Sequence, residues 1–225
     1  MTIGIIVAMD KEFDLILSIL QQPQIRTIKH LTFATGTLGK NRLAVTKSGM
    51  GKVNAAAATV EMINNFSPSA IINTGIAGAL DKKLSVMDIV LGAEVVYHDV
   101  WCGTGNKYGQ VQDLPAIFIA SPKLLQKALS IKTDTSVHSG LIASGDQFIS
   151  TIEDIQAIKN HFPKALAVDM ESAAIAQTCY LYRIPFLSLR IISDTPGITN
   201  HYDQYLDFWN LAPEKSLSLI KSLLR

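Results

Sequence analysis

The stretch Ala70-Ile71-Ile72-Asn73-Thr74 opens with an unbroken apolar run, and runs of this kind set the fold class. A second run, Phe186-Leu187-Ser188-Leu189, is nearly as uniform. Strands that are apolar on both faces are typical of a sheet covered by helices on both sides. On either side of these runs, short strand-like segments alternate with longer amphipathic ones. This alternation predicts an α/β fold of three layers, αβα, around a mixed, largely parallel central sheet.

The predicted elements span nearly the whole chain, without a repeat, a low-complexity tract or a linker. We therefore expect a single domain over residues 1–225. The expected strands are Thr2–Ala8, Arg42–Ser48, Ala70–Thr74, Ile89–Tyr97, Gly140–Ala143, Leu166–Asp169 and Pro185–Ile192. The expected helices are Glu12–Leu20, Val53–Asn65, Pro122–Ser130, Thr151–His161, Glu171–Tyr182 and Leu206–Leu224. Two long irregular stretches, 98–117 and 195–205, are expected to be functional loops or interface elements.

Composition excludes several classes of protein. Of 225 residues, 48% are hydrophobic and 17% charged, an ordinary globular balance. The net charge of +1, with scattered lysines and arginines, argues against nucleic-acid binding. No apolar run approaches the roughly 20 residues of a membrane-spanning helix, and the short opening run is expected to be a strand rather than a signal peptide. Cys102 and Cys179, far apart, are expected to be free thiols in a reducing cytoplasm.

Polar and glycine residues follow the predicted strands, where ligands of such sheets bind. These segments are 9–12, 49–52, 73–78, 144–149, 168–171 and 190–194. Three of them carry the carboxylates Glu12, Glu171 and Asp194. Singly, each carboxylate is explained equally well as a helix N-terminal or turn residue. Together at one edge of a sheet, they indicate acid-base chemistry.

Several familiar motifs are absent from the sequence. Gly49-Met50-Gly51-Lys52 ends like a phosphate-binding P-loop but lacks its first glycine, and Val53 replaces the required Ser or Thr. No GxSxG, HExxH or GxGxxG occurs. The five histidines show no metal-ligand spacing. We therefore expect neither a metal nor a cofactor.

In order and spacing, the segments at the strand ends resemble those of the bacterial 5′-methylthioadenosine/S-adenosylhomocysteine nucleosidases, which have the nucleoside phosphorylase-like fold. The resemblance covers essentially the whole chain. The segments that carry it are 3–12, 48–56, 73–78, 97–99, 144–149, 168–171 and 190–194. It implies hydrolysis of the N-glycosidic bond of methylthioadenosine and S-adenosylhomocysteine, with 5′-deoxyadenosine as a further candidate substrate.

The resemblance also implies a role for each site residue. Glu12 would activate the attacking water, and Asp194, supported by Ser193, would protonate adenine at N7. Glu171 would hold the ribose hydroxyls, with Met170 packed against the sugar. Phe148 would stack on the purine, and the backbone of Ile149 would read its edge. The remaining expected lining residues are Met9, Met50, Ile76 and Arg190.

Glycosidic cleavage requires such groups independently of family, because positive charge builds on the sugar and negative charge on the departing base. An unperturbed aspartate of pKa ~3.9 is protonated about once in a thousand at pH 7. Burial raises such a pKa, so we expect Asp194 to be shielded from water. Alternatively, Asp194 stays ionised and relays a proton from solvent to N7.

Three alternative functions stay open at this stage. A phosphate-dependent purine nucleoside phosphorylase would need a cationic phosphate site, which Glu12 disfavours. A futalosine-type nucleosidase of menaquinone synthesis would use the same carboxylates. The segment around Trp101 differs from that of many family members, so this alternative stays open. A non-catalytic nucleoside-binding domain should have lost one of the three carboxylates. In the family, the region 98–117 helps close the neighbouring subunit's pocket, so a homodimer is expected.

Overall fold

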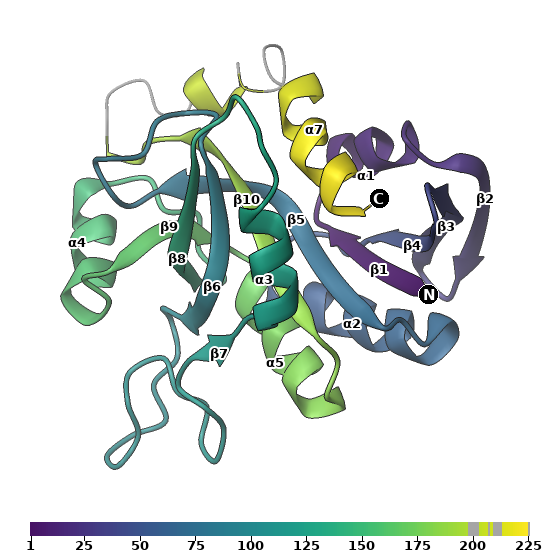
Figure 1. Cartoon of the computed structure of the whole chain (residues 1–225). Helices are drawn as coiled ribbons and strands as arrows, with labels where there is room; N and C mark the ends of the chain where they lie inside the picture. The colour runs from purple at the N-terminus through teal and green to yellow at the C-terminus, as the bar shows by residue number, and fades with distance from the viewer. Residues whose placement is uncertain (198–202, 207, 209–212, 225) are drawn as a thin grey trace.

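The computed structural model describes residues 1–197, 203–206, 208 and 213–224 (Figure 1). In chain order its elements are β1 (Thr2–Val7), α1 (Asp10–Leu17), β2 (Gln21–Ile28), β3 (Leu31–Leu38), β4 (Asn41–Lys47), α2 (Lys52–Phe66), β5 (Ala70–Ala79), β6 (Ile89–Tyr97), β7 (Phe118–Ile119), α3 (Pro122–Leu129), β8 (Val137–Ser144), α4 (Ile152–His161), β9 (Ala165–Asp169), α5 (Ser172–Tyr182), β10 (Phe186–Asp194) and α7 (Pro213–Leu224).

One mixed sheet runs through the molecule in the order β10-β6-β8-β9-β5-β1-β4-β3-β2, with β7 added beside β6. Parallel pairings join β1 to β4 and β5, β5 to β10, and β8 to β6 and β9. Because β5 pairs with β10 along its length and with β9 at its end, the strands β5, β10, β6, β8 and β9 close into a ring. One apolar cluster draws on all five of these strands: Ala77, Ala79, Leu84, Val90, Ile142, Leu166, Ala167 and Ile192.

Helices cover both faces of the sheet, which confirms the three-layer prediction. Successive side chains of a strand point to opposite faces. Accordingly, Ile5 of β1 packs in the cluster that includes residues of α1, α3 and α7, whereas Ile6 packs in the cluster with α2 and α5. A strand covered on both sides is buried at nearly every position, which favours a nearly continuous apolar run. The uniform runs of the sequence therefore have the predicted cause.

Some predicted boundaries were wrong. The antiparallel strands β2 and β3 and the short β7 were not predicted. β2 carries the polar sequence QQPQIRTI at the edge of the sheet and is almost entirely exposed, so hydrophobic periodicity gives no signal there. β5 continues to Ala79, so residues 75–78 belong to the strand rather than to a segment that follows it.

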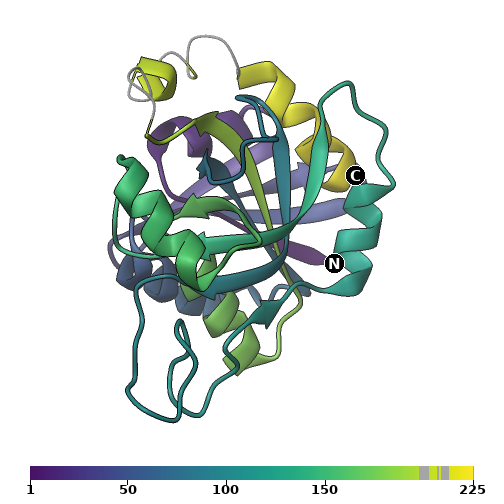
Figure 2. The ribbon, with the colours of Figure 1, turned by 90° about the vertical axis from the view of Figure 1, so that its left-hand side faces the viewer.

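At the C-terminal end, residues 203–206 are helical and α7 begins at Pro213. The predicted helix Leu206–Leu224 is therefore only partly recovered, because residues 207 and 209–212 lie outside the described part of the chain. Within the predicted loop 195–205, residues 198–202 also lie outside it. No helix in the described ranges is long and apolar enough to cross a membrane. The segment 98–117, between β6 and β7, projects from the body of the molecule in both views (Figures 1 and 2).

Candidate active site

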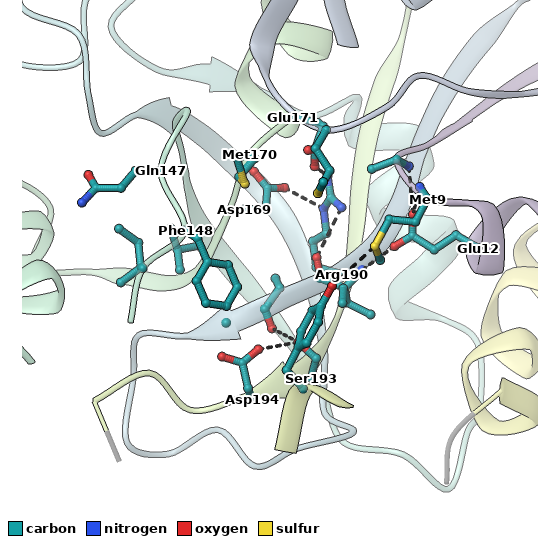
Figure 3. A pocket seen from close by; sticks show the side chains of 18 residues that line it. Met9, Glu12, Gln147, Phe148, Asp169, Met170, Glu171, Arg190, Ser193 and Asp194 are labelled. Carbon is teal, nitrogen blue, oxygen red and sulfur yellow. Dashed lines mark hydrogen bonds and ion pairs between the residues drawn. The ribbon is translucent and has the colours of Figure 1, made fainter. Parts of the chain in front are cut away.

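A pocket of about 610 Å³, partly open to solvent, lies at the carboxyl ends of β1, β8, β9 and β10 and along the last residues of β5 (Figure 3). All eleven residues predicted for the site line it: Met9, Glu12, Met50, Ile76, Phe148, Ile149, Met170, Glu171, Arg190, Ser193 and Asp194. The fold thus gathers residues from six separate segments of the chain at one place, as expected for strand ends in a sheet of this kind.

Glu12 lies in the first turn of α1 and is buried, with 5% of its surface exposed. Its Oε2 accepts hydrogen bonds from the amides of Ala8 (2.8 Å) and Met9 (3.0 Å), and its Oε1 accepts one from Ile76 (3.1 Å). Burial raises the pKa of Glu12 above its ordinary value, although the charge of Arg190 and the three amides lower it in part. A carboxylate with a raised pKa is a better proton acceptor, which is the property of a general base.

Arg190 is a buried cation at the centre of the site. Its Nε lies 2.6 Å from Asp169 Oδ2, and its Nη2 lies 3.5 Å from Glu171 Oε2. It also donates hydrogen bonds to Asn73 Oδ1 and Ser172 Oγ. Arg190, expected from the sequence only as a lining residue, makes direct ion pairs with Asp169 and Glu171.

Gly75 of β5 explains how Glu12 and Arg190 come close together. A Cβ atom at Gly75 would lie 2.6 Å from both Glu12 Oε1 and Arg190 Nη1. Such distances are far inside van der Waals contact. Any side chain at this position would therefore push the two charged groups apart.

Glu171 precedes α5, and its Oε1 accepts a hydrogen bond from the amide of Gly51 (3.0 Å) at the start of α2. Burial raises the pKa of Glu171 to about 7, with the charges of Asp169 and Glu12 adding to the rise and those of Arg190 and the Gly51 amide opposing it. The N-terminus of α2 favours a carboxylate at this point, since the first amides of a helix have no partners within the helix.

Asp194 ends β10 and is 3% exposed, so the expected shielding from water is confirmed. Ser193 Oγ donates a hydrogen bond of 2.6 Å to Asp194 Oδ1. Figure 3 shows Asp194 and Phe148 on one side of the pocket and Glu12 on the other. The two buried carboxylates therefore face the two ends of one cavity, with an aromatic ring near one of them.

Several lining residues were not predicted. Tyr205 donates a hydrogen bond from its hydroxyl to Met9 Sδ (3.6 Å) and packs edge-on against Phe148, with the ring centroids 6.0 Å apart. It does not directly follow a predicted strand, so the strand-end rule gave no signal for it. Asp169 could have been found, because in Asp169-Met170-Glu171 it repeats the acid two positions before Glu171 at the end of a strand. The others are Ala8, Ala77, Gly78, Gln147 and Val168.

Comparison with known proteins agrees with this geometry. The family model of the Phosphorylase superfamily matches residues 2–225. A 5′-methylthioadenosine/S-adenosylhomocysteine nucleosidase of Staphylococcus aureus is 44% identical over 195 residues, which cover 85% of this chain and 86% of that protein. The chain belongs to the 5′-methylthioadenosine/S-adenosylhomocysteine nucleosidase family. The resemblance and the fold class expected from the sequence are thereby confirmed.

Solved structures of this nucleosidase family superpose over the whole chain. The enzyme of Streptococcus pneumoniae, with a transition-state inhibitor, has a TM-score of 0.94 and 34% identity, covering 100% of this chain and 98% of that one. The enzyme of Colwellia psychrerythraea, in complex with adenine, has a TM-score of 0.93 and 35% identity, covering 100% of this chain and 94% of that one. Among the described residues of this chain, no group of three His, Cys, Asp or Glu side chains is placed to hold a metal ion.

Proposed function

We propose that this protein hydrolyses the N-glycosidic bond of 5′-methylthioadenosine and S-adenosylhomocysteine, releasing adenine and the thioribose. The observation that carries the proposal is the pair of buried carboxylates, Glu12 and Asp194, at opposite ends of one pocket. The membership of the nucleosidase family supports the same reaction. We include 5′-deoxyadenosine as a further substrate, because it differs only in lacking the 5′ sulfur group.

Each carboxylate has its own task in this reaction. Glu12 accepts a proton from a water molecule as the water oxygen bonds to C1′ of the ribose. The C1′–N9 bond breaks, and its electron pair leaves with the purine. Asp194, held by Ser193, delivers a proton to N7, so that neutral adenine departs. Solvent later takes the proton from Glu12 and restores the one on Asp194, and the net reaction consumes one water.

The other lining residues hold the nucleoside. Glu171 accepts hydrogen bonds from the ribose hydroxyls, and Met170 packs against the sugar. Phe148 stacks on the purine, whose edge the backbone of Ile149 reads. The 5′ thioether, which is apolar, suits the sulfur-rich and aromatic wall formed by Met9, Met50, Ile76 and Tyr205.

Hydrolysis is favoured over transfer to phosphate. The guanidinium of Arg190 is already paired with Asp169 and Glu171, and it lies close to Glu12 across Gly75. The first amides of α2, a helix start that could hold an anion, already donate to Glu171 and Asp146. A phosphate anion entering this site would meet carboxylates rather than free donors, and in a buried site their repulsion is only weakly screened.

We further propose a homodimer in which the segment 98–117 closes the 5′ end of the partner's pocket. The projection of this segment and the exposure of Trp101 support the proposal, as do the half-exposed lining residues Met50 and Phe148 at the pocket mouth. We also propose that the chain is a single domain, since the central strand β5 pairs with strands from both ends of the sequence. A cytoplasmic location is proposed on the free thiols Cys102 and Cys179.

The test is adenine release from methylthioadenosine in phosphate-free buffer, followed by the same assay with phosphate added. We expect rapid release without phosphate, together with free methylthioribose, and no increase when phosphate is present. The Glu12→Gln variant serves as the matched control for contaminating nucleosidase. Release that requires phosphate would identify a phosphorylase. Release from neither mixture would contradict the proposal and make futalosine the next substrate to test.

A further inference from the structure

Asp146 lies outside the wall of the pocket, yet it joins three segments that follow three different strands. Its Oδ1 accepts a hydrogen bond from the backbone amide of Lys52 (2.7 Å), at the start of α2. Its own amide donates to Asp99 Oδ2 (2.8 Å), after β6. The Nζ of Lys52 lies 2.6 Å from the same Asp99 oxygen and 3.8 Å from Asp146 Oδ2. The ends of β4, β6 and β8 are thus bound together by one carboxylate and its neighbours.

The contact bears directly on the site, because the residue before Lys52 is Gly51. The amide of Gly51 donates to Glu171, the carboxylate proposed to hold the ribose. The two consecutive amides at the start of α2 therefore donate hydrogen bonds to two acids, Glu171 inside the pocket and Asp146 outside it. If Asp146 holds Lys52 in place, it also sets the direction of the Gly51 amide toward Glu171.

Two glycines of this region, Gly51 and Gly145, leave room for the carboxylates of Asp146 and Asp99 beside the backbone. A Cβ atom at Gly51 would lie 2.9 Å from Asp146 Oδ1, and the φ angle of Gly51 is +93°. A Cβ atom at Gly145 would lie 2.8 Å from Asp99 Cγ and 2.6 Å from His98 Nε2. Both glycines let a carboxylate approach the backbone closely, which a side chain would prevent.

We propose that Asp146 is a positioning residue of the nucleosidase, which aligns the Gly51 amide on Glu171 through its hydrogen bond to the amide of Lys52. The expected effect on catalysis rests on the proposed function, whereas the alignment of the Gly51 amide on Glu171 does not. The ion pairs of Lys52 are secondary, because the side chains of Asp146 and Lys52 are partly exposed and solvent weakens their attraction. The backbone hydrogen bond carries the effect.

Three variants separate the contribution of the backbone hydrogen bond from that of the ion pairs: Asp146→Ala, Asp146→Asn and Lys52→Met. Alanine removes the acceptor, asparagine keeps an acceptor without the charge, and methionine at 52 removes the ion pairs but keeps the backbone amide. For Asp146→Ala we expect kcat/KM for methylthioadenosine to fall ~10-fold, about the net value of one hydrogen bond. We expect Asp146→Asn and Lys52→Met to stay within about 3-fold of the unmodified protein.

The decisive measurement is the double-variant cycle with Glu171→Ala. If Asp146 acts through Glu171, removing Asp146 should cost less than about 3-fold once Glu171 is gone, because coupled residues are not additive. Equal losses in both backgrounds would overturn the proposal, as would a Lys52→Met loss as large as that of Asp146→Ala. A merely structural role would lower stability without this coupling.

Amide hydrogen exchange on the ligand-free protein tests the alignment without any substrate. In Asp146→Ala, the Gly51 amide should exchange ~10-fold faster, while its rate in Lys52→Met should change little. An unchanged Gly51 rate in Asp146→Ala would contradict the proposal. If the protein does not release adenine, the proposed function fails, but this exchange measurement still decides the alignment. Asp146→Ser replaces the alanine variant should that variant not fold.

Discussion

Replacing Glu171 with glutamine should stabilise the protein at alkaline pH, although it removes a side chain that we place against the ribose. Burial raises the pKa of Glu171 from its ordinary value of 4.5 to about 7, with the charges of Asp169 and Glu12 adding to the rise. Arg190 and the Gly51 amide oppose the rise without cancelling it. At about 1.4 kcal/mol for each pKa unit, ionising Glu171 in the folded protein costs about 3 kcal/mol.

The sign of the pH dependence follows from the raised pKa. The folded state binds the proton of Glu171 more tightly than the unfolded state does, so this group's contribution to stability is fully present below pH 4.5. It is lost as the pH rises toward about 7. Glutamine resembles the protonated acid and does not ionise. The variant should therefore match the unmodified protein near pH 4.5 and exceed it by up to about 3 kcal/mol above pH 7, or about 10 °C in Tm for a chain of this size.

Urea unfolding followed by circular dichroism, at several values between pH 4.5 and 8.5, would measure this difference. Glu61→Gln is the matched control, because the ion pair with Lys29 lowers the pKa of Glu61. For Glu61 the sign is reversed, so its variant should be the less stable one at neutral pH. The reasoning would be refuted if Glu171→Gln were no more stable than the unmodified protein at pH 8. Pairing with Arg190 would then outweigh burial.

Three further predictions concern the same pocket. Glu12→Gln and Asp194→Asn should each lower kcat for adenine release by at least ~10²-fold with the fold intact by circular dichroism, and near-normal turnover would remove the assigned role. Gly75→Ala should lower kcat at least as strongly as it lowers Tm, because its Cβ would collide with Glu12 and Arg190, and full activity would show that the two groups need not be close. Arg190→Met should lower the free energy of unfolding at pH 8 by about 3–5 kcal/mol, since it leaves carboxylates buried without their cation; this deficit should shrink toward pH 5, and a deficit independent of pH would argue against that cause.

The residues predicted for the site line one pocket, because most of them stand at or shortly after the carboxyl end of a strand. Glu12, Glu171 and Asp194 each follow an apolar run, and strands of this fold class bring their carboxyl ends to one edge. The specific roles came from the resemblance to the nucleosidase family rather than from spacing. Ile76 shows the difference: it was predicted as a lining residue in the segment that follows the strand, and the structure places it in the pocket but within β5.

The edge strand β2 has no buried face and therefore escaped prediction. β2 is polar and exposed, and backbone pairing with β3 places it at the edge of the sheet. Backbone pairing of this kind leaves no pattern in side-chain hydropathy. Tyr205 escaped for another reason, since it lies outside the strand-end segments and contacts Met9 and Phe148 from the segment after β10.

The sequence by itself determined the layers of the fold and the chemical types in the site. Apolar runs require cover on two faces, and carboxylates that follow them must meet at one sheet edge. Only the tertiary structure decided which carboxylates pair with Arg190, that Glu171 has a raised pKa, and that Asp146 reaches the start of α2. Desolvation and Coulomb energies depend on distances between atoms, and these atoms belong to residues far apart in the sequence, such as Gly51 and Glu171, which are 120 positions apart.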